Sequence, residues 1–257
     1  MTTALKDRVH IEPSRESMGA LAASHIASEI RKLLKSQDHV RIIFAAAPSQ
    51  SEMLSALANE PDVDWKRVEA FHMDEYIGLP EGARQSFGVW LKHHFFDRVP
   101  LGKVALIEPG TAPEQCAMKY SAALSSEPID IVCMGIGVNG HIAFNDPPAD
   151  FNDPADVKIV RLDGVSRQQQ VDEGLFDALA EVPTHAITLT IPRLLRVGKI
   201  FCCAPGHLKM RAVAEALEGP LSPNVPASIL QEQPNCQIYL DYESAAGLQL
   251  YTRSTEN

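Results

Sequence analysis

A glycine-rich segment in the middle of the chain places proton-transfer side chains next to a backbone that can turn sharply. The spacing Gly-x-Gly-x-x-Gly over residues 135–140 leads directly into His141. Glycine allows close approach to a ligand, so this segment would present Asn139, His141 and Asp146 to a site. An amide and a carboxylate beside an imidazole can fix its tautomer and tune its pKa. The segment therefore predicts a catalytic histidine, and the alternative is a structural histidine bonded to neighbouring backbone.

The same glycine spacing also occurs in dinucleotide-binding proteins. In those proteins the last glycine opens a helix whose N-terminus holds a pyrophosphate. Here Pro147 and Pro148 follow too soon for a long helix, and the motif lies in mid-chain. We therefore expect no nicotinamide cofactor, and we expect Gly137 and Gly140 to bring the backbone close to a substrate.

Ionisable residues also follow two other apolar runs. Asp74 and Glu75 come after Val68–Met73, and adjacent side chains at a strand end point in opposite directions, so one of the two would face a site. A carboxylate there can take a proton from a carbon next to a carbonyl; the alternative is a helix cap or a turn acid. Lys209 lies in the first turn of a predicted helix, where a cation and free N–H groups favour an anion. The alternative for Lys209 is a solvated surface lysine.

Apolar periodicity places these residues among alternating strands and helices. We expect strands over Val40–Phe44, Val68–Met73, Ile129–Met134, Ala186–Thr190, Lys199–Cys203 and Gln237–Leu240. We expect helices over Arg15–Lys35 (capped by Ser14), Ser51–Leu57, Phe87–Phe96 and His207–Leu217, and a short helix from Ile191. This alternation predicts an α/β fold with a mostly parallel sheet and helices on both faces.

In such a fold the ligand lies beyond the carboxyl ends of the strands. The segments Ala45–Gln50, Asp74–Pro80 and Gly135–Pro148 follow strands and would meet at that edge. The polar segment Ala149–Pro183 is expected to be irregular or to form a lid over the site.

The composition narrows the class of protein. The 257 residues, 45% hydrophobic and 22% charged, predict a single soluble domain. A net charge of −10 argues against nucleic acid or an anionic membrane as partner, and an anionic substrate would need a local cluster of donors. The N-terminus lacks the apolar core of a signal peptide. Five cysteines without a zinc-binding spacing predict a cytoplasmic protein with no metal.

Together these segments resemble the glucosamine-6-phosphate isomerase/deaminase family, whose superfamily includes 6-phosphogluconolactonases. The resemblance spans about residues 40–240 and is most specific in Met73–Pro80 and Gly135–Asp146. In lactonases the first block resembles Asp-Glu-Arg and the second resembles Asp-Gly-His-Thr. Tyr76 and Ile142 in this chain favour the deaminase branch.

The resemblance implies a Rossmann-like fold of the deaminase/lactonase type and an enzyme that acts on a small-molecule sugar phosphate with no metal or organic cofactor. The sequence is compatible with a homo-oligomer. The reaction would be aldose–ketose isomerisation with deamination of an amino-sugar phosphate. Asp74 would move a proton between C2 and C1, and His141, held by Asn139 and Asp146, would assist ring opening. The alternatives are a lactone hydrolase in which His141 activates water, and a non-catalytic sugar-phosphate sensor.

The chain departs from the family pattern where the phosphate would bind. The family's first loop resembles Thr-Gly-Gly-Thr, whereas this chain has Ala46, Ala47, Pro48 and Ser49. Pro48 has no N–H to donate, and one hydroxyl is gone. We expect Ala46, Ala47 and Ser49 to contact the substrate nonetheless.

Charged positions change as well. The family's lid arginine aligns with Asp172, which replaces a cation by an anion. Lys209 would then be the main phosphate ligand, with Arg167 as a substitute cation and Glu75 as a further substrate contact. At Asp146 the deaminases typically have Glu, so the carboxylate beside His141 is one methylene shorter.

Overall fold

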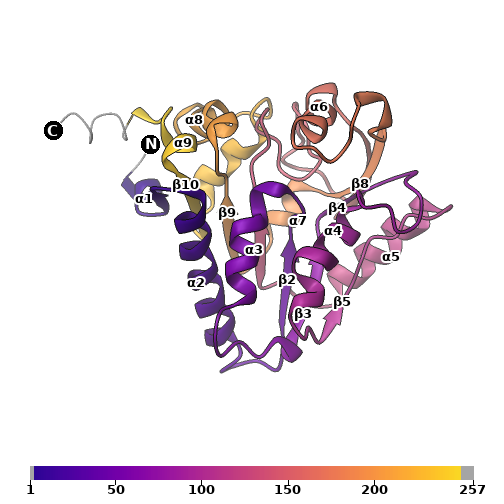
Figure 1. Cartoon of the computed structure of the whole chain (residues 1–257), viewed down its shortest axis with the longest axis horizontal. Coiled ribbons are helices and arrows are strands. Elements are labelled where there is room, and N and C mark those ends of the chain that lie inside the picture. The colour runs from indigo at the N-terminus through magenta and orange to yellow at the C-terminus, as the bar shows by residue number, and fades with distance from the viewer. Residues whose placement is uncertain (1–2, 250–257) are drawn as a thin grey trace.

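Seven parallel strands form the main sheet of the computed structural model, which describes residues 3–249 (Figure 1). The spatial order is β1-β10-β9-β6-β2-β3-β5, and each neighbouring pair runs in the same direction. The strands are Val9–Glu12 (β1), Val40–Phe44 (β2), Val68–His72 (β3), Lys103–Val104 (β5), Ile131–Met134 (β6), Lys199–Cys203 (β9) and Cys236–Asp241 (β10). Every residue of β2 and β6 is buried, as the apolar runs predict for a sheet covered on both faces.

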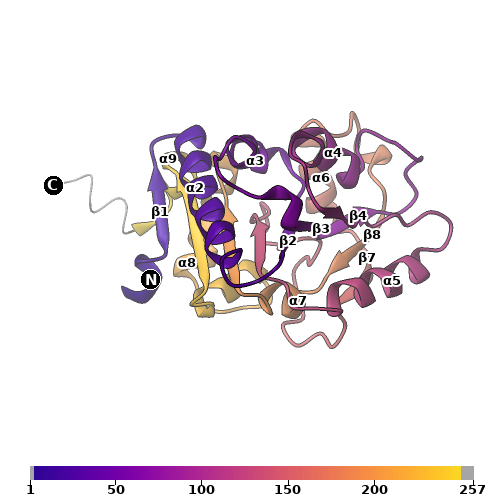
Figure 2. The same cartoon turned by 90° about the horizontal axis from the view of Figure 1, so that it is seen from below.

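Helices cover both faces of this sheet (Figure 2). Alternate strand residues point into two separate cores: Ile42 and Phe44 pack with one set of helices, and Ile43 packs with the other. The first set is Arg15–Leu33 (α2), Ser51–Ala58 (α3) and Phe87–His94 (α4); the second is Pro113–Ser125 (α5), Ile191–Leu195 (α7), Met210–Glu218 (α8) and Tyr242–Ala245 (α9). A short helix, Thr3–Lys6 (α1), precedes β1. The predicted α/β class is thus confirmed.

Helix α2 begins where the sequence predicts. The hydroxyl of Ser14 accepts a hydrogen bond from the N–H of Ser17, and the Ser17 hydroxyl in turn accepts from the N–H of Ser14, which forms a capping box. Close contact with α3 requires a glycine, because a Cβ at Gly19 would lie 2.8 Å from the backbone of Glu52. This contact fixes the position of α3, and so it also fixes one end of the loop after β2, which leads directly into α3.

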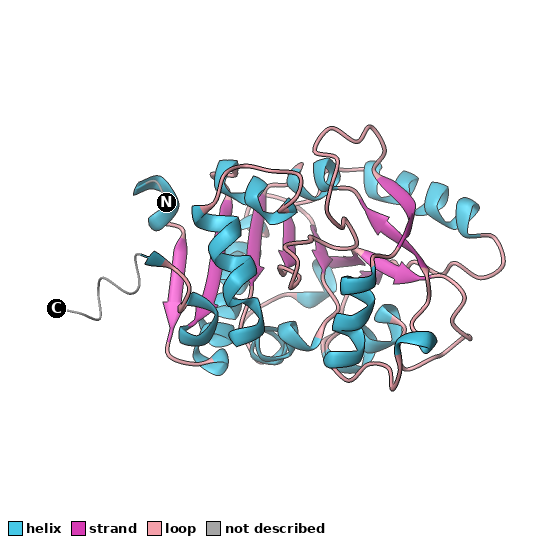
Figure 3. Ribbon diagram, turned by 90° about the horizontal axis from the view of Figure 1, so that it is seen from above, coloured by secondary structure: helices cyan, strands magenta, loops and turns pink. Residues whose placement is uncertain are grey.

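A second, smaller sheet differs from the predicted arrangement. It is antiparallel, with the order β4-β8-β7 over Asp74–Tyr76 (β4), His185–Leu189 (β8) and Val157–Arg161 (β7) (Figure 3). The chain leaves the main sheet after His72 and continues as β4, so Asp74 begins a strand instead of a loop. The run predicted over Ala186–Thr190 is therefore a strand of this small sheet. Its apolar residues correctly indicate a buried strand, but this pattern does not say with which other strands it pairs.

The segment Ala149–Pro183 is irregular only in part, and a role as a lid over the site stays a prediction. It contains β7 and the helix Gly164–Asp172 (α6), which begins at Asp163, whose carboxylate accepts from the N–H of Val165. In Figure 1, α6 lies above the edge at which β2 and β9 end. Within the described residues no helix is long and apolar enough to cross a membrane.

Candidate active site

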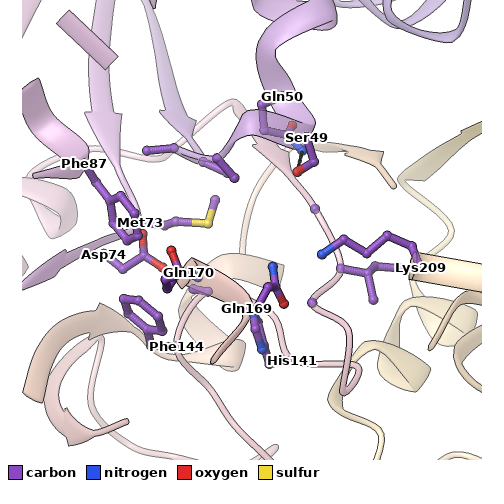
Figure 4. A pocket seen from close by; sticks show the side chains of 17 residues that line it. Ser49, Gln50, Met73, Asp74, Phe87, His141, Phe144, Gln169, Gln170 and Lys209 are labelled. Atoms are coloured by element: carbon purple, nitrogen blue, oxygen red, sulfur yellow. Dashed lines mark hydrogen bonds between the residues drawn. The ribbon is translucent and has the colours of Figure 1, made fainter. Parts of the chain in front are cut away.

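A cavity at the carboxyl edge of the main sheet gathers the three predicted post-strand segments (Figure 4). We call it the site cavity. Its walls come from the loop after β2, the junction of β3 with β4, the loop after β6, helices α4 and α6, and the residue that caps the start of α8. The lining residues are Ala45, Ala46, Ala47, Ser49, Gln50, Met73, Asp74, Phe87, Gly135, Ile136, Gly137, His141, Ala143, Phe144, Gln169, Gln170 and Lys209.

Asp74 contributes a buried carboxyl group to this cavity. Pairing of Asp74 with Thr188 in the small sheet fixes its backbone, and only 6% of the residue is exposed. Burial, and next the charge of Glu75, raises the pKa of the Asp74 carboxyl well above its ordinary value. A carboxyl with a raised pKa is a stronger base once it is ionised.

Glu75 points away from the site cavity and supports helix α4 instead. Its carboxylate accepts hydrogen bonds from the N–H of Phe87 at 3.1 Å, the N–H of Gly88 at 2.9 Å and the hydroxyl of Ser86 at 2.7 Å. It therefore satisfies the free N–H groups of the first helical turn. The structure places Glu75 outside the lining residues, so the two neighbouring acids do divide between a site and a helix cap.

His141 is held in one tautomer by Asn139. The Asn139 Oδ1 accepts from the backbone N–H of His141 at 3.1 Å and lies 2.7 Å from the ring Nδ1. An amide oxygen has no proton to give, so Nδ1 carries the proton and Nε2 is left as an acceptor. Burial lowers the pKa of His141 to about 4, although the nearby Asp146 carboxylate acts in the opposite direction. The imidazole is neutral at pH 7 and can accept a proton through Nε2.

Two further side chains complete the support of this ring. Ser166, from α6, has its hydroxyl 2.9 Å from His141 Nδ1 and donates to Asp146 Oδ1. That carboxylate oxygen is itself 3.4 Å from Nδ1, and the other one accepts from the N–H of Asp163 at 3.0 Å. Sequence reasoning missed Ser166, because it lies 20 residues after Asp146 and only the fold brings α6 against the glycine segment.

Replacing Ser166 with alanine tests this support. The change removes a hydroxyl that accepts from the imidazole and donates to Asp146, so we expect the ring to lose part of its orientation. A lost hydrogen bond of this kind corresponds to a fall of about tenfold in kcat. Steady-state kinetics with the expected amino-sugar phosphate measure it, and a kcat equal to that of the parent chain would contradict the role.

Lys209 lies at another wall of the site cavity. In Figure 4, Asp74 and Lys209 are on opposite sides, with His141 between them. Only 5% of Lys209 is exposed, and its Nζ is 3.5 Å from the Oε1 of Glu173. Burial lowers the pKa of Lys209, and Glu173 partly offsets this. The lysine is therefore not the solvated surface residue that was the alternative.

The loop after β2 lines the cavity with small and polar groups. Ala46, Ala47 and Ser49 are all lining residues, as is Gln50, which sequence reasoning missed. The Gln50 Nε2 donates to the carbonyl of Cys203 at 3.1 Å and to the Ser49 hydroxyl at 3.3 Å. Nothing in the local pattern distinguishes Gln50 from a solvated residue at a helix start.

Three predicted substrate contacts, Glu75, Arg167 and Gly140, lie outside the cavity. Glu75 is turned toward the start of α4, as described above. The Arg167 guanidinium donates to the carbonyls of Leu179 and Val182, so it joins α6 to the following segment. Gly140 has a φ of +81° and its N–H donates to the carbonyl of Gly137, so its glycine is needed for the turn. Gly137 does line the cavity. Within residues 3–249 no three His, Cys, Asp or Glu side chains group closely enough to hold a metal ion.

The fold and these groups define an α/β enzyme with a buried carboxyl and an oriented imidazole at the carboxyl edge of a parallel sheet. Residues 13–238 match the glucosamine-6-phosphate isomerase/6-phosphogluconolactonase family, and the chain belongs to that family.

Glucosamine-6-phosphate deaminases are among its relatives, and its structural neighbours include a deaminase and 6-phosphogluconolactonases. A glucosamine-6-phosphate deaminase of Listeria monocytogenes is 34% identical over 229 residues, which are 88% of this chain and 95% of that protein. One from Bacillus cereus is 32% identical over 218 residues, 84% of this chain and 80% of that protein. A monomeric glucosamine-6-phosphate deaminase shares the fold with a TM-score of 0.86 and 24% identity, over 93% of this chain and 99% of that one. The 6-phosphogluconolactonase of Thermotoga maritima shares it with a TM-score of 0.74 and 18% identity, over 91% and 98%.

Proposed function

We propose that the chain converts a 2-amino-sugar phosphate, of the glucosamine 6-phosphate type, into a ketose phosphate and ammonia. The observation that carries this proposal is that Asp74 and the neutral His141 face one cavity. Isomerisation of an aldose needs a base for the carbon acid, and ring opening needs a group that exchanges a proton with the sugar oxygens. The two side chains supply one of each.

The steps follow from these positions. His141 Nε2 takes the proton of the C1 hydroxyl as the ring opens, and that proton passes to the ring oxygen. The Asp74 carboxylate removes the proton from C2 of the open chain and returns it to C1, while the C1 carbonyl oxygen gains a proton and the C2 amino group gives one up. The resulting imine at C2 reacts with water, so that ammonia leaves and a ketone remains.

Lys209, Ser49 and the backbone of the loop after β2 would hold the distant phosphate end of the sugar. Lys209 and Ser49 lie across the cavity from Asp74 in Figure 4, and an extended sugar phosphate has its reacting carbons and its phosphate at opposite ends. We assign the activity to the cytoplasm, where the five free cysteines would stay reduced.

The test is ammonia release from glucosamine 6-phosphate and galactosamine 6-phosphate by the purified chain. Hydrolysis of 6-phosphogluconolactone is followed in parallel, since a neutral imidazole can also activate water. Ammonia release with no lactone hydrolysis supports the proposal. Lactone hydrolysis alone would replace it with the hydrolase function, and binding without turnover would replace it with a sensor.

The pH dependence of this activity should reflect the burial of Asp74. The base must be ionised, so kcat/KM should fall with falling pH through the raised pKa of Asp74, at a midpoint above the ordinary aspartate value of about 4. His141 stays neutral down to about pH 4, so it does not set this midpoint. The pKa of the substrate's phosphate is measured separately by phosphorus NMR, so that its contribution to the pH profile can be removed. A midpoint at or below about pH 4 would exclude Asp74 as the base.

A further inference from the structure

The cation that lines the site cavity is already paired with a carboxylate of the same chain. Lys209 is the one lysine or arginine among the described lining residues, and its Nζ lies 3.5 Å from the Oε1 of Glu173. Glu173 follows directly on α6 as its C-cap residue. The positive charge that would attract a phosphate is therefore already balanced before any ligand arrives.

This carboxylate is fixed by a second contact. The side-chain amide of Gln169 donates to Glu173 Oε1 at 2.7 Å, and its oxygen accepts from the N–H of Val138 at 3.0 Å. Gln169 thus links Glu173 to the glycine segment that carries His141. The other oxygen of Glu173 is buried and has no hydrogen-bond partner among the described residues, so the carboxylate is held toward Lys209 through one oxygen.

Two neighbouring residues at this end of the cavity have no free donor to offer a dianion. Gln50 is 1% exposed, and its Oε1 has no partner among the described residues while its Nε2 is engaged by Cys203 and Ser49. The amide therefore offers the cavity an acceptor, which suits a hydroxyl better than a phosphate oxygen. Pro48, in the loop beside it, has no N–H to donate.

We propose that Glu173 is a specificity residue that competes with the substrate's phosphate for Lys209. Its carboxylate weakens phosphate binding and lowers the preference of the enzyme for a phosphorylated amino sugar over the same sugar with a free hydroxyl. The kinetic part of this inference rests on the proposed function, whereas the binding part does not.

The variant Glu173→Gln tests the competition directly. Glutamine keeps the size of the side chain and an oxygen that can accept from Gln169, but it removes the charge beside Lys209. We expect inorganic phosphate to bind this full-length variant more tightly by about tenfold or more, because a like charge within a few ångströms is lost from a partly buried site. Isothermal titration calorimetry measures the affinity for phosphate. Because burial lowers the pKa of Lys209, the titration is repeated at a lower pH, at which the lysine is protonated in both proteins.

Asp172→Asn is the matched control. Asp172 precedes Glu173, is exposed, and accepts from Gln168 at 2.9 Å, so its loss changes the net charge equally without touching Lys209. Its effect on phosphate binding should stay within about threefold because solvent screens it. If Glu173→Gln binds phosphate no more tightly than Asp172→Asn, the competition does not exist.

Kinetics then show whether the competition sets specificity. The ratio of kcat/KM for glucosamine 6-phosphate to that for glucosamine should rise in Glu173→Gln by a factor similar to the gain in phosphate affinity. An unchanged ratio, with ammonia still released, would overturn the specificity role. If no variant and no parent chain releases ammonia from either sugar, the proposed function fails, and the phosphate titration still decides the competition for Lys209.

Discussion

Replacing Asp74 with asparagine should abolish most ammonia release while leaving the protein folded. Asparagine has the shape of aspartate but cannot take a proton from C2, and a positioned base contributes about 10²–10⁴-fold to the rate. We therefore expect kcat to fall by about that factor or more. Stability should not fall, because burial disfavours the ionised form of Asp74 and a neutral amide avoids that cost. Steady-state kinetics and thermal unfolding at neutral pH measure the two quantities.

The neighbouring acid supplies the control for this experiment. Glu75 accepts hydrogen bonds from two backbone N–H groups at the start of α4 and lies outside the site cavity, so Glu75→Gln should lower the melting temperature and reduce kcat far less than Asp74→Asn. The pair of variants separates catalysis from structure at adjacent positions. An Asp74→Asn enzyme that kept its activity within tenfold would rule out Asp74 as the base and favour a reaction that ionises no carbon acid.

The contrast between these two acids also shows what the sequence can predict. Alternation along a strand indicates that adjacent side chains diverge, but it does not say which of them meets a cavity. That choice depends on β4 leaving the main sheet to pair with β8, a long-range pairing with no local signal. The central strands β2, β6 and β9 were predictable because burial on both faces requires continuous apolar runs.

Helix α5 is absent from the predicted elements because its apolar periodicity is weak. Only Ala117, Tyr120 and Leu124 are buried over its 13 residues, so its apolar face is too sparse to stand out from a polar loop. Among the site groups, Asp74, His141 and Lys209 were predictable from chemistry at the ends of apolar runs. Ser166, Gln169 and Glu173 were not, because α6 comes from a polar segment whose path over the cavity is set by tertiary contacts.

Replacing Gly137 with alanine should disable His141 without altering any ionisable group. A Cβ at Gly137 would lie 2.2 Å from the Cε1 and the Nε2 of the His141 ring, well inside van der Waals contact, so the imidazole must turn or shift. Its Nδ1 would then leave the 2.7 Å contact with Asn139, and Nε2 would leave its position in the cavity. A displacement of about 1 Å can cost about 10²-fold in rate, and we expect a fall in kcat of at least that order.

Gly164→Ala is the matched control for this change. Gly164 opens α6 close to the same network, but a Cβ there meets no atom within 4 Å, so alanine should be accepted with kcat nearly unchanged. In Gly137→Ala the histidine ring resonances should shift in NMR spectra, whereas in Gly164→Ala they should not. If Gly137→Ala kept full activity, the close packing of the ring on the glycine would have no part in catalysis. If it lost activity with the His141 resonances unmoved, the glycine would act through the cavity wall, since the ring would still be in place.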